Sequence, residues 1–367
     1  MKRRTYLAVA TAVAVAGCST ADDDPPTDED DDPPGRTGTE QESQPIDSVD
    51  RLIEQLESAT EGDVITVPPD VTIDLTDHWE IPVPPGVTLS GGRRAGVPGA
   101  LLRSPEGDKT PESETFIRKL TLNEGARLTG FRLRGHHHAY VDPEEEHDGD
   151  YHAHRAGGGV TAKEESIVDN NEISGWPFTG VYTKANAHIH SNYIHHNAWD
   201  GLGYGVANYG GNPLIERNYF DANRHSVACS GEGGYVARYN HFGPITYSHV
   251  MDVHSPGGTR IEIYNNTVEA VESAQNGDQR PAVAIRGTPR DVATINNNWF
   301  YNSDEPLDTP DGWTTRHAII QVGVDEWTNV EWSGNHYGNG KPSNDAGAPE
   351  IRQTWNPADP ELPDRIH

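Results

Sequence analysis

The chain has 367 residues, of which 57 are acidic and 28 basic, and its formal net charge at pH 7 is −29. A negative charge of this size excludes nucleic acid as a partner. Only six of the basic residues are lysines and acidic residues are spread over the whole length, so the surrounding salt must screen the self-repulsion.

The first twenty residues, MKRRTYLAVATAVAVAGCST, have the composition of an export signal. A basic start precedes an apolar run that is short for a membrane span, and small residues lead to Cys18. Arg3 and Arg4 resemble a twin-arginine signal, and VAGC resembles a lipoprotein cleavage site. The resemblance implies cleavage before Cys18 and lipid attachment to it, as in an exported cell-surface lipoprotein of a salt-loving archaeon. A plain secretory signal with an incidental cysteine is the alternative.

Composition divides the rest of the chain. Residues 19–45 are acidic, rich in proline and almost free of apolar side chains, which predicts a disordered tether. We expect a folded domain over 46–345 and a proline-rich C-terminal extension over 346–367. The mature chain has two cysteines, Cys18 and Cys229, and with Cys18 lipidated no intramolecular disulfide forms. We expect a monomer whose only membrane contact is the lipid anchor.

The folded part begins with a predicted helix and then strands. SVDRLIEQLESA, at 48–59, has the apolar spacing of a short amphipathic helix. GDVITVPPDVTIDL (62–75) and PPGVTLSGG (84–92) read as the first strands. The helix is therefore predicted to cap one end of a β-structure.

One pattern then recurs seven times: an apolar residue, two residues, asparagine, one residue and a second apolar residue. The seven asparagines are Asn171, Asn192, Asn218, Asn240, Asn266, Asn298 and Asn335. A strand-like unit of this length cannot bury a core alone, but stacked copies can, so the repeat predicts a solenoid. Asparagine suits a sharp bend, and its amide can pair with the same amide one rung away.

These repeats resemble those of right-handed parallel β-helix proteins of the pectate-lyase-like superfamily over residues 60–340. HIHSNYIHHN, LIERNYFDAN and IEIYNNTVEA are typical examples. The resemblance implies an all-β fold, a single-stranded right-handed parallel β-helix with a short N-terminal capping helix. Lyases, hydrolases, epimerases and non-catalytic binders share this fold, so the fold alone does not assign a function.

Each repeat carries a second strand about ten residues after its asparagine, at 180–184, 201–205, 226–230, 250–254 and 282–286. Strand alternation predicts inward side chains at Val181, Leu202, Val227, Met251 and Val283, and also at Thr183, Tyr204, Cys229, Val253 and Ile285. The outward positions are then Tyr182, Lys184, Gly203, Gly205, Ala228, Ser230, Asp252, His254, Ala284 and Arg286. With rungs roughly 5 Å apart, Lys184 and His254 face each other across about 14 Å. This predicts a shallow groove with small residues on its floor.

Polar residues also precede these strands, where they would form the rim of the groove. We predict that they bind substrate: Trp199, Asp200, Arg224, His225 and His249. Arginine clamps carboxylates bidentately, so an acidic polysaccharide is the expected partner. The alternative for Arg224, His225 and His249 is that they cap the carbonyl groups of the turns.

Lyases that resemble this fold remove the proton next to a uronate carboxylate and expel the glycosidic oxygen. The reaction requires a cation at the carboxylate, a base and a proton donor. The resemblance implies Arg286 or Arg224 as the cation and His254 or Lys184 as the base.

The remaining roles fall to three residues. Tyr182 or His225 would donate the proton, and Asp252 would orient His254 or bind a divalent cation such as calcium. An epimerase of polymer-bound uronic acids would use the same residues. The sequence contains neither the calcium-binding aspartate cluster of pectate lyases nor the paired aspartates of polygalacturonases, which disfavours those two activities.

A second cluster lies in the insertion RGHHHAYVDPEEEHDGDYHAHRAGGG, residues 134–159. It holds six of the 18 histidines, within 136–154, together with many carboxylates. It would bind a divalent ion or cover the groove, although its spacing matches no defined metal motif, and a hydrated loop is the alternative. This cluster also supports a different class of function: a non-catalytic surface lipoprotein that binds glycans or metal, or an accessory protein that delivers metal to an exported enzyme.

Overall fold

The computed structural model describes residues 45–105, 117–136, 157–198, 201–269, 279–310, 312–313 and 315–348. The predicted signal with Cys18, the tether up to residue 44, Trp199, Asp200, nearly all of the histidine-rich segment and residues 349–367 lie outside these ranges. Among the described residues, no helix has the length and hydrophobicity that a membrane crossing requires.

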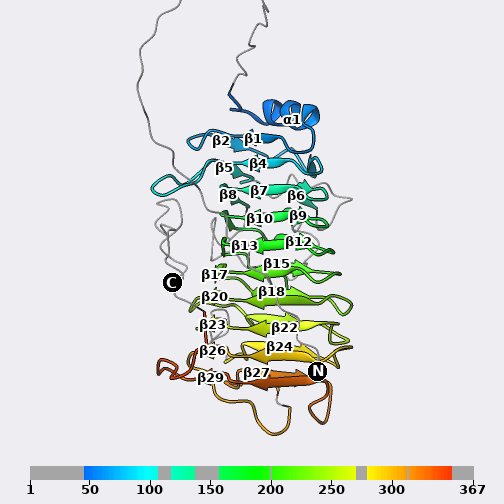
Figure 1. Ribbon diagram of the computed structural model, residues 1–367, viewed down its shortest axis with the longest axis vertical. Helices are drawn as coiled ribbons and strands as arrows, with labels where there is room; N and C mark the ends of the chain where they lie inside the picture. The colour runs from blue at the N-terminus through cyan, green and yellow to red at the C-terminus, as the bar shows by residue number, and fades with distance from the viewer. Residues whose placement is uncertain are drawn as a thin grey trace, which may run out of the picture. The chain divides into compact units, whose positions relative to one another are not determined.

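The described strands form three parallel sheets, and one strand from each sheet makes up a rung of a right-handed β-helix (Figure 1). The first sheet contains, in spatial order, β1 (Val64–Thr66), β4 (Thr88–Ser90), β7 (Arg127–Thr129), β10 (Ile167–Asp169), β13 (His188–His190), β16 (Leu214–Glu216), β19 (Tyr235–Arg238), β22 (Ile261–Tyr264), β25 (Ala293–Asn296) and β28 (Val330–Ser333). The predicted fold class is confirmed.

The other two sheets run alongside the first. The second sheet contains β2 (Thr72–Asp74), β5 (Leu101–Arg103), β8 (Arg132–Arg134), β11 (Glu172–Ser174), β14 (Tyr193–His195), β17 (Tyr219–Asp221), β20 (His241–Phe242), β23 (Thr267–Val268), β26 (Trp299–Phe300) and β29 (His336–Tyr337). The third sheet contains β3 (Ile81–Val83), β6 (Arg118–Leu122), β9 (Gly158–Ala162), β12 (Thr179–Thr183), β15 (Tyr204–Asn208), β18 (His225–Cys229), β21 (Met251–Val253), β24 (Val283–Arg286) and β27 (Ile319–Val322).

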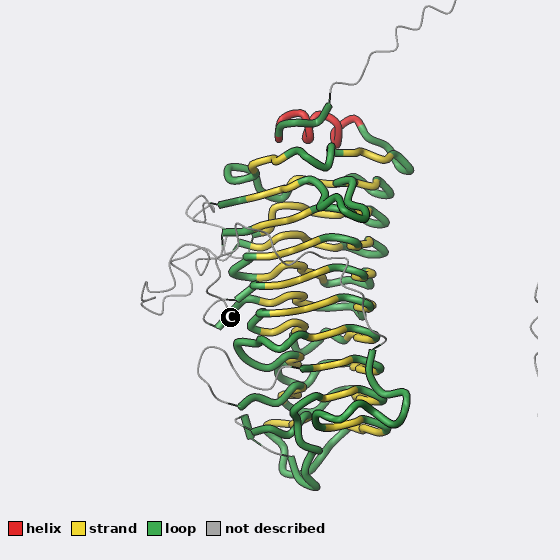
Figure 2. Tube along the Cα trace, turned by 90° about the vertical axis from the view of Figure 1, so that its left-hand side faces the viewer, coloured by secondary structure: helices red, strands yellow, loops and turns green. Residues whose placement is uncertain are grey.

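The predicted helix is α1, Val49–Ser58, and it lies at the N-terminal end of the stack (Figure 2). The side chain of Ser48 accepts a hydrogen bond from the backbone N–H of Arg51, which caps the first turn. Leu52 and Leu56 are buried and belong to the same apolar core as the strands. The helix therefore covers the end of the core, as its apolar spacing predicts.

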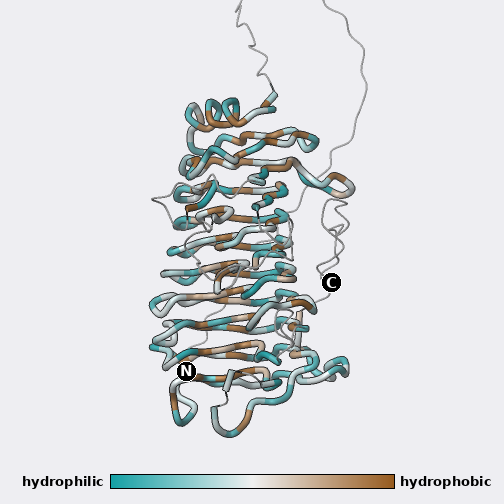
Figure 3. The backbone as a smooth tube through the Cα atoms, turned by 180° about the vertical axis from the view of Figure 1, so that it is seen from behind, coloured by the Kyte–Doolittle hydropathy of each residue, from teal (hydrophilic) through white to brown (hydrophobic). Residues whose placement is uncertain are grey.

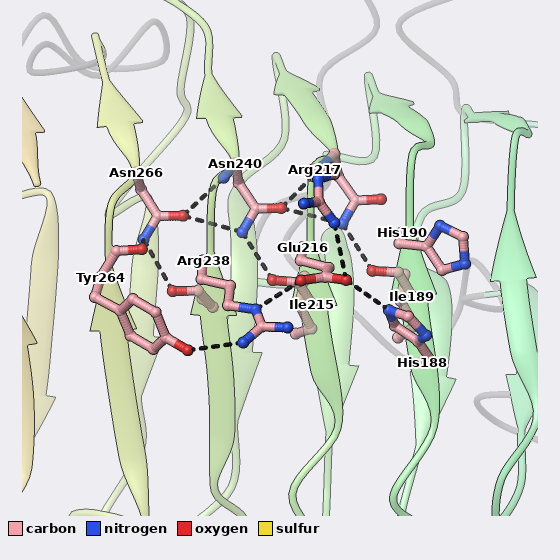
Figure 4. Close-up of polar contacts among 12 residues, drawn as sticks. His188, Ile189, His190, Ile215, Glu216, Arg217, Arg238, Asn240, Tyr264 and Asn266 are labelled. Carbon is pink, nitrogen blue, oxygen red and sulfur yellow. Dashed lines mark hydrogen bonds and ion pairs between the residues drawn. The ribbon is translucent and has the colours of Figure 1, made fainter. Parts of the chain in front are cut away.

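The repeated asparagines form a ladder between the first and second sheets (Figure 4). The side-chain amide of Asn218 donates to Oδ1 of Asn240 at 3.1 Å, and that of Asn240 donates to Asn266 at 3.0 Å. The left-handed backbone conformation, however, falls on the residue before each ladder asparagine, for example Arg217 with φ 54° and Tyr239 with φ 56°. The ladder asparagine serves as a hydrogen-bonding group, while its predecessor makes the bend.

The interior is a column of apolar side chains from α1 to β28. In Figure 3, hydrophobic and hydrophilic segments are interspersed along the stack of rungs. Phe220 and Phe242 stack inside the column with ring centroids 5.0 Å apart. Cys229 lies in the same core, as the alternation predicts.

Replacing Phe220 with alanine is expected to lower the free energy of unfolding by about 3–5 kcal/mol, because the side chain is fully buried and neighbouring rungs cannot close the cavity. Urea denaturation at constant salt measures this loss. Val292→Ala serves as the control, since Val292 is 41% exposed. A similar loss in both variants would contradict the expectation.

Candidate active site

The outer face of the third sheet carries the predicted ionisable residues. Asp252 lies between Met251 and Val253, which are both in the core, so its side chain leaves the opposite face. Backbone pairing aligns Tyr182, Ala207, Ala228, Asp252 and Ala284 in one outward row across five rungs. The predicted orientation of the 180–184, 226–230, 250–254 and 282–286 strands agrees with this row.

The predicted strand 201–205 is wrong. The strand of that rung is β15, Tyr204–Asn208, and Val206 rather than Leu202 pairs with Val181. Gly201 and Gly203 have φ angles of 72° and 88°, so they belong to the turn before the strand. Tyr204, predicted to point inward, belongs instead to an apolar cluster on the outer face.

That cluster fills the floor of the predicted groove. Phe178, Tyr204, Ala207 and Ala228 are buried together, with Tyr182 and Leu202 packed against them. The floor of small side chains is therefore present as Ala207 and Ala228, and not as Gly203 and Gly205, but aromatic rings cover it. Among the described residues, Ala207 and Ala228 are thus buried rather than exposed as the floor of a groove between Lys184 and His254.

Asp252 is the centre of the polar network on this face. Arg286 donates to both carboxylate oxygens, with Nε 2.9 Å from Oδ1. Nε2 of His225 lies 3.2 Å from Oδ2, and Nε2 of His254 lies 3.1 Å from the same oxygen. The structure thus brings three predicted catalytic residues, Asp252, His254 and Arg286, together with His225, which was predicted at the rim.

Burial and charge set the protonation of this network. Burial alone would raise the pKa of Asp252, but His225, His254 and Arg286 outweigh it, and the pKa lies well below its usual value. The carboxylate is therefore ionised. Burial holds the pKa of His225 well below its usual value and lowers that of His249 to about 4, although Asp252 opposes both shifts.

An aromatic column runs beside the carboxylate. The ring of Tyr204 stacks on His225 at 5.6 Å, His225 stacks on His249 at 5.8 Å, and His249 lies 5.2 Å from Trp313. Nδ1 of His225 is 2.7 Å from the backbone oxygen of His249, which is the capping contact that the alternative interpretation predicts. Burial raises the pKa of Tyr204, with Arg224 and Arg286 opposing the shift.

Lys184 does not join this network in the described structure. Its Nζ lies over the ring of Tyr182, 6.0 Å from the centroid, and the strands β15 and β18 separate it from His254. Tyr182 packs instead against Phe178 and Tyr209, and Arg118 lies over its ring at 4.3 Å. Tyr182 and Lys184 therefore flank the aromatic side of the face, away from Asp252.

Several residues of this face are absent from the predicted site residues, among them Phe178 and Tyr209 beside Tyr182. Tyr204 was misplaced by the register error, Arg118 lies in an early strand without the asparagine pattern, and Trp313 lies in a long connection. The guanidinium carbon of Arg286 also lies over the ring of Trp313, 4.7 Å from the ring centroid. Only an isolated basic or aromatic residue marked these positions in the sequence, and that signal is common to many surface positions.

The three parallel sheets define the fold class of this protein, and a family model matches part of the chain. The model described as right handed beta helix region matches residues 112–242. With the three parallel sheets, the chain is a right-handed parallel β-helix protein.

Comparison with solved structures and curated proteins gives three findings. An alginate lyase from Paenibacillus sp. strain FPU-7 is similar with a TM-score of 0.51 at 16% identity, over 80% of this chain and 95% of that chain. The A-module of the mannuronan C-5 epimerase AlgE6 from Azotobacter vinelandii gives a TM-score of 0.41 at 14% identity, over 79% and 94%. No curated protein matches the sequence. The likeness to the lyase shows a shared fold.

Proposed function

We propose that the protein is carbohydrate-active and that the outer face of its third sheet cleaves a uronic-acid polymer by β-elimination. The observation that carries the proposal is the network of His254, Asp252 and Arg286, a partly exposed imidazole and guanidinium on one ionised carboxylate. The fold, which an alginate lyase shares, is compatible with this chemistry.

His254 is the proton acceptor in this mechanism. The ionised Asp252 beside its Nε2 favours the proton on that nitrogen, which leaves the lone pair on Nδ1 to take the proton next to the substrate carboxylate. The side chain of His254 is 33% exposed, while that of Asp252 is fully buried. His254 is thus placed to exchange protons with a substrate, and the buried Asp252 is placed to orient its ring.

Cationic and aromatic groups would bind the polymer. Nε and one terminal nitrogen of Arg286 donate to Asp252, and the side chain is 29% exposed. Its positive charge would attract the substrate carboxylate. Tyr182 and Tyr209, with rings 5.4 Å apart, offer a surface on which sugar rings stack. We assign Tyr204 as the proton donor, because its ring stacks on that of His225 and lies 6.3 Å from that of His254.

The purified protein is expected to raise the ultraviolet absorbance of one uronic-acid polymer, because elimination creates a conjugated double bond. Alginate, pectate, glucuronan and glycosaminoglycans form the panel, each in molar potassium chloride with and without calcium. Inversion of the carbon next to the uronate carboxylate, without the absorbance rise, would indicate an epimerase. Retained polymer binding with neither product would move the assignment to a non-catalytic glycan-binding β-helix.

We also propose that the protein works at the cell surface, held by the lipid that the sequence predicts on Cys18. Cys18→Ser is expected to move the protein from the membrane fraction to the medium. A membrane-bound Cys18→Ser protein would contradict this anchor.

A further inference from the structure

Three side chains on the outer face of the third sheet point one donor atom each at a common space. Among the described residues, His225, Asp252 and His254 place these atoms within 4.8 Å of one another. The two imidazole nitrogens lie 3.2 and 3.1 Å from Oδ2 of Asp252. Both nitrogens are buried, and neither makes a contact with hydrogen-bond geometry.

His225 cannot satisfy its surroundings as a neutral ring. Its Nδ1 lies 2.7 Å from the backbone oxygen of His249, so the proton of the neutral ring belongs on Nδ1. The lone pair of Nε2 then faces a carboxylate oxygen, and two acceptors oppose each other. If the proton is on Nε2 instead, the lone pair of Nδ1 faces the backbone oxygen of His249, so two acceptors again oppose each other. The ring is fully buried, which disfavours the doubly protonated form.

A cation between the three atoms removes this conflict. Metal–ligand bonds of about 2.1 Å place neighbouring ligands about 3.0–3.4 Å apart in octahedral or tetrahedral geometry. The two nitrogen–oxygen distances fall in this range. Two imidazole nitrogens and one carboxylate are donors that suit first-row transition metals, whereas calcium prefers oxygen ligands.

We propose that His225, Asp252 and His254 form a binding site for a divalent transition-metal ion such as Zn²⁺. Nε2 of each histidine and Oδ2 of Asp252 are the ligand atoms, and further positions are left for water or a substrate oxygen. The ion enters from the side of His254, whose side chain is 33% exposed, because the other two side chains have no exposed surface.

The surroundings of the three ligands support the assignment. His225 donates its Nδ1 proton to the oxygen of His249, and Arg286 donates to both oxygens of Asp252, Oδ1 and the proposed ligand atom Oδ2. Metal-binding histidines usually donate their second N–H in this way, and ligating carboxylates are hydrogen-bonded in turn. The ring of His225 is also fixed between Tyr204 and His249.

The metal site regulates the proposed elimination, and this part rests on the proposed function. An ion on Nε2 of His254 leaves the proton of the neutral ring on Nδ1, so the ring has no lone pair for the substrate. Zn²⁺ is therefore expected to inhibit elimination, and a chelator is expected to restore it.

Isothermal titration of the chelator-treated protein with Zn²⁺, and in parallel with Ca²⁺, tests the site directly. We expect one Zn²⁺ site that His254→Ala weakens more than about 100-fold and Arg286→Lys weakens about 10–100-fold. His225→Ala should also remove it, but His254 is the safer substitution because its side chain is partly exposed. Ca²⁺ should not occupy this site.

Two controls separate this site from other histidines. His241→Ala should keep it, because His241 pairs with Glu269 on the second sheet. A variant with alanine at His136, His137, His138, His147, His152 and His154 should also keep it. Unchanged Zn²⁺ binding in His254→Ala would overturn the proposal. If the protein binds Zn²⁺ but eliminates no polymer, the metal site stands and the lyase assignment is wrong. If it eliminates a polymer but binds no Zn²⁺, the lyase assignment stands and the metal site is wrong.

Discussion

Replacing His254 with alanine is expected to lower the rate of polymer elimination by about 10²–10⁴, because a positioned proton acceptor contributes a factor of that size. The loss should appear in kcat, while polymer binding, which rests on the tyrosines and Arg286, changes little. The side chain is partly exposed and outside the core, so the variant is expected to fold. The measurement is the initial rate of the ultraviolet absorbance rise.

The matched control is His241→Ala. This histidine also pairs with a carboxylate, at 2.9 Å from Glu269, but it lies on the second sheet. It should keep the full rate. If His254→Ala kept the rate as well, another group would be the base and the proposed mechanism would be wrong.

Replacing Asn218 with alanine is expected to lower the free energy of unfolding by about 3–5 kcal/mol, since each buried polar group left without a partner costs about 1–3 kcal/mol. Asn218 donates to the backbone oxygen of Ile189 and to Asn240, and its Oδ1 accepts from the backbone and side chain of Asn192. Cavity formation adds little because the side chain is small.

Asn335 provides the graded comparison because it is the final ladder asparagine and is partly exposed. Water can replace its partners, so Asn335→Ala is expected to lose only about 1–2 kcal/mol. Urea denaturation at one salt concentration measures both losses. Equal losses would show that the depth of the ladder does not determine its stability.

The sequence predicts the stack well because the signal is local and repeated. Each ladder asparagine bonds to its counterpart one rung away, so a short pattern marks the seven bends between the first and second sheets from β10 to β29. The helix at 48–59 is predicted from its apolar spacing for the same reason. The ordering of rungs then follows from the chain order alone.

The outer face is predicted only in part. Asp252 lies between two apolar core residues, so its orientation is unambiguous. The segment around Tyr204 alternates apolar residues with glycines, and two registers fit it equally, so only the turn at Gly201 and Gly203 decides. The stacking of Trp313 on His249 depends on a connection that no strand pattern describes.

In all but the first two rungs, the connection between the first and second sheets is short and constant in length, whereas the connection between the second and third sheets varies. This difference bears on how the protein can diversify. From β7 to β29 the first and second sheets are always joined by two residues, such as 217–218 and 239–240. Connections between the second and third sheets range from residues 222–224 to residues 135–157, and they all lead into the third sheet, which carries the candidate site. One corner of the scaffold thus has a constant length, while the segments beside the site can be lengthened or exchanged one at a time. Preference for a new polymer can therefore evolve by loop replacement, without any rung having to change its pairing.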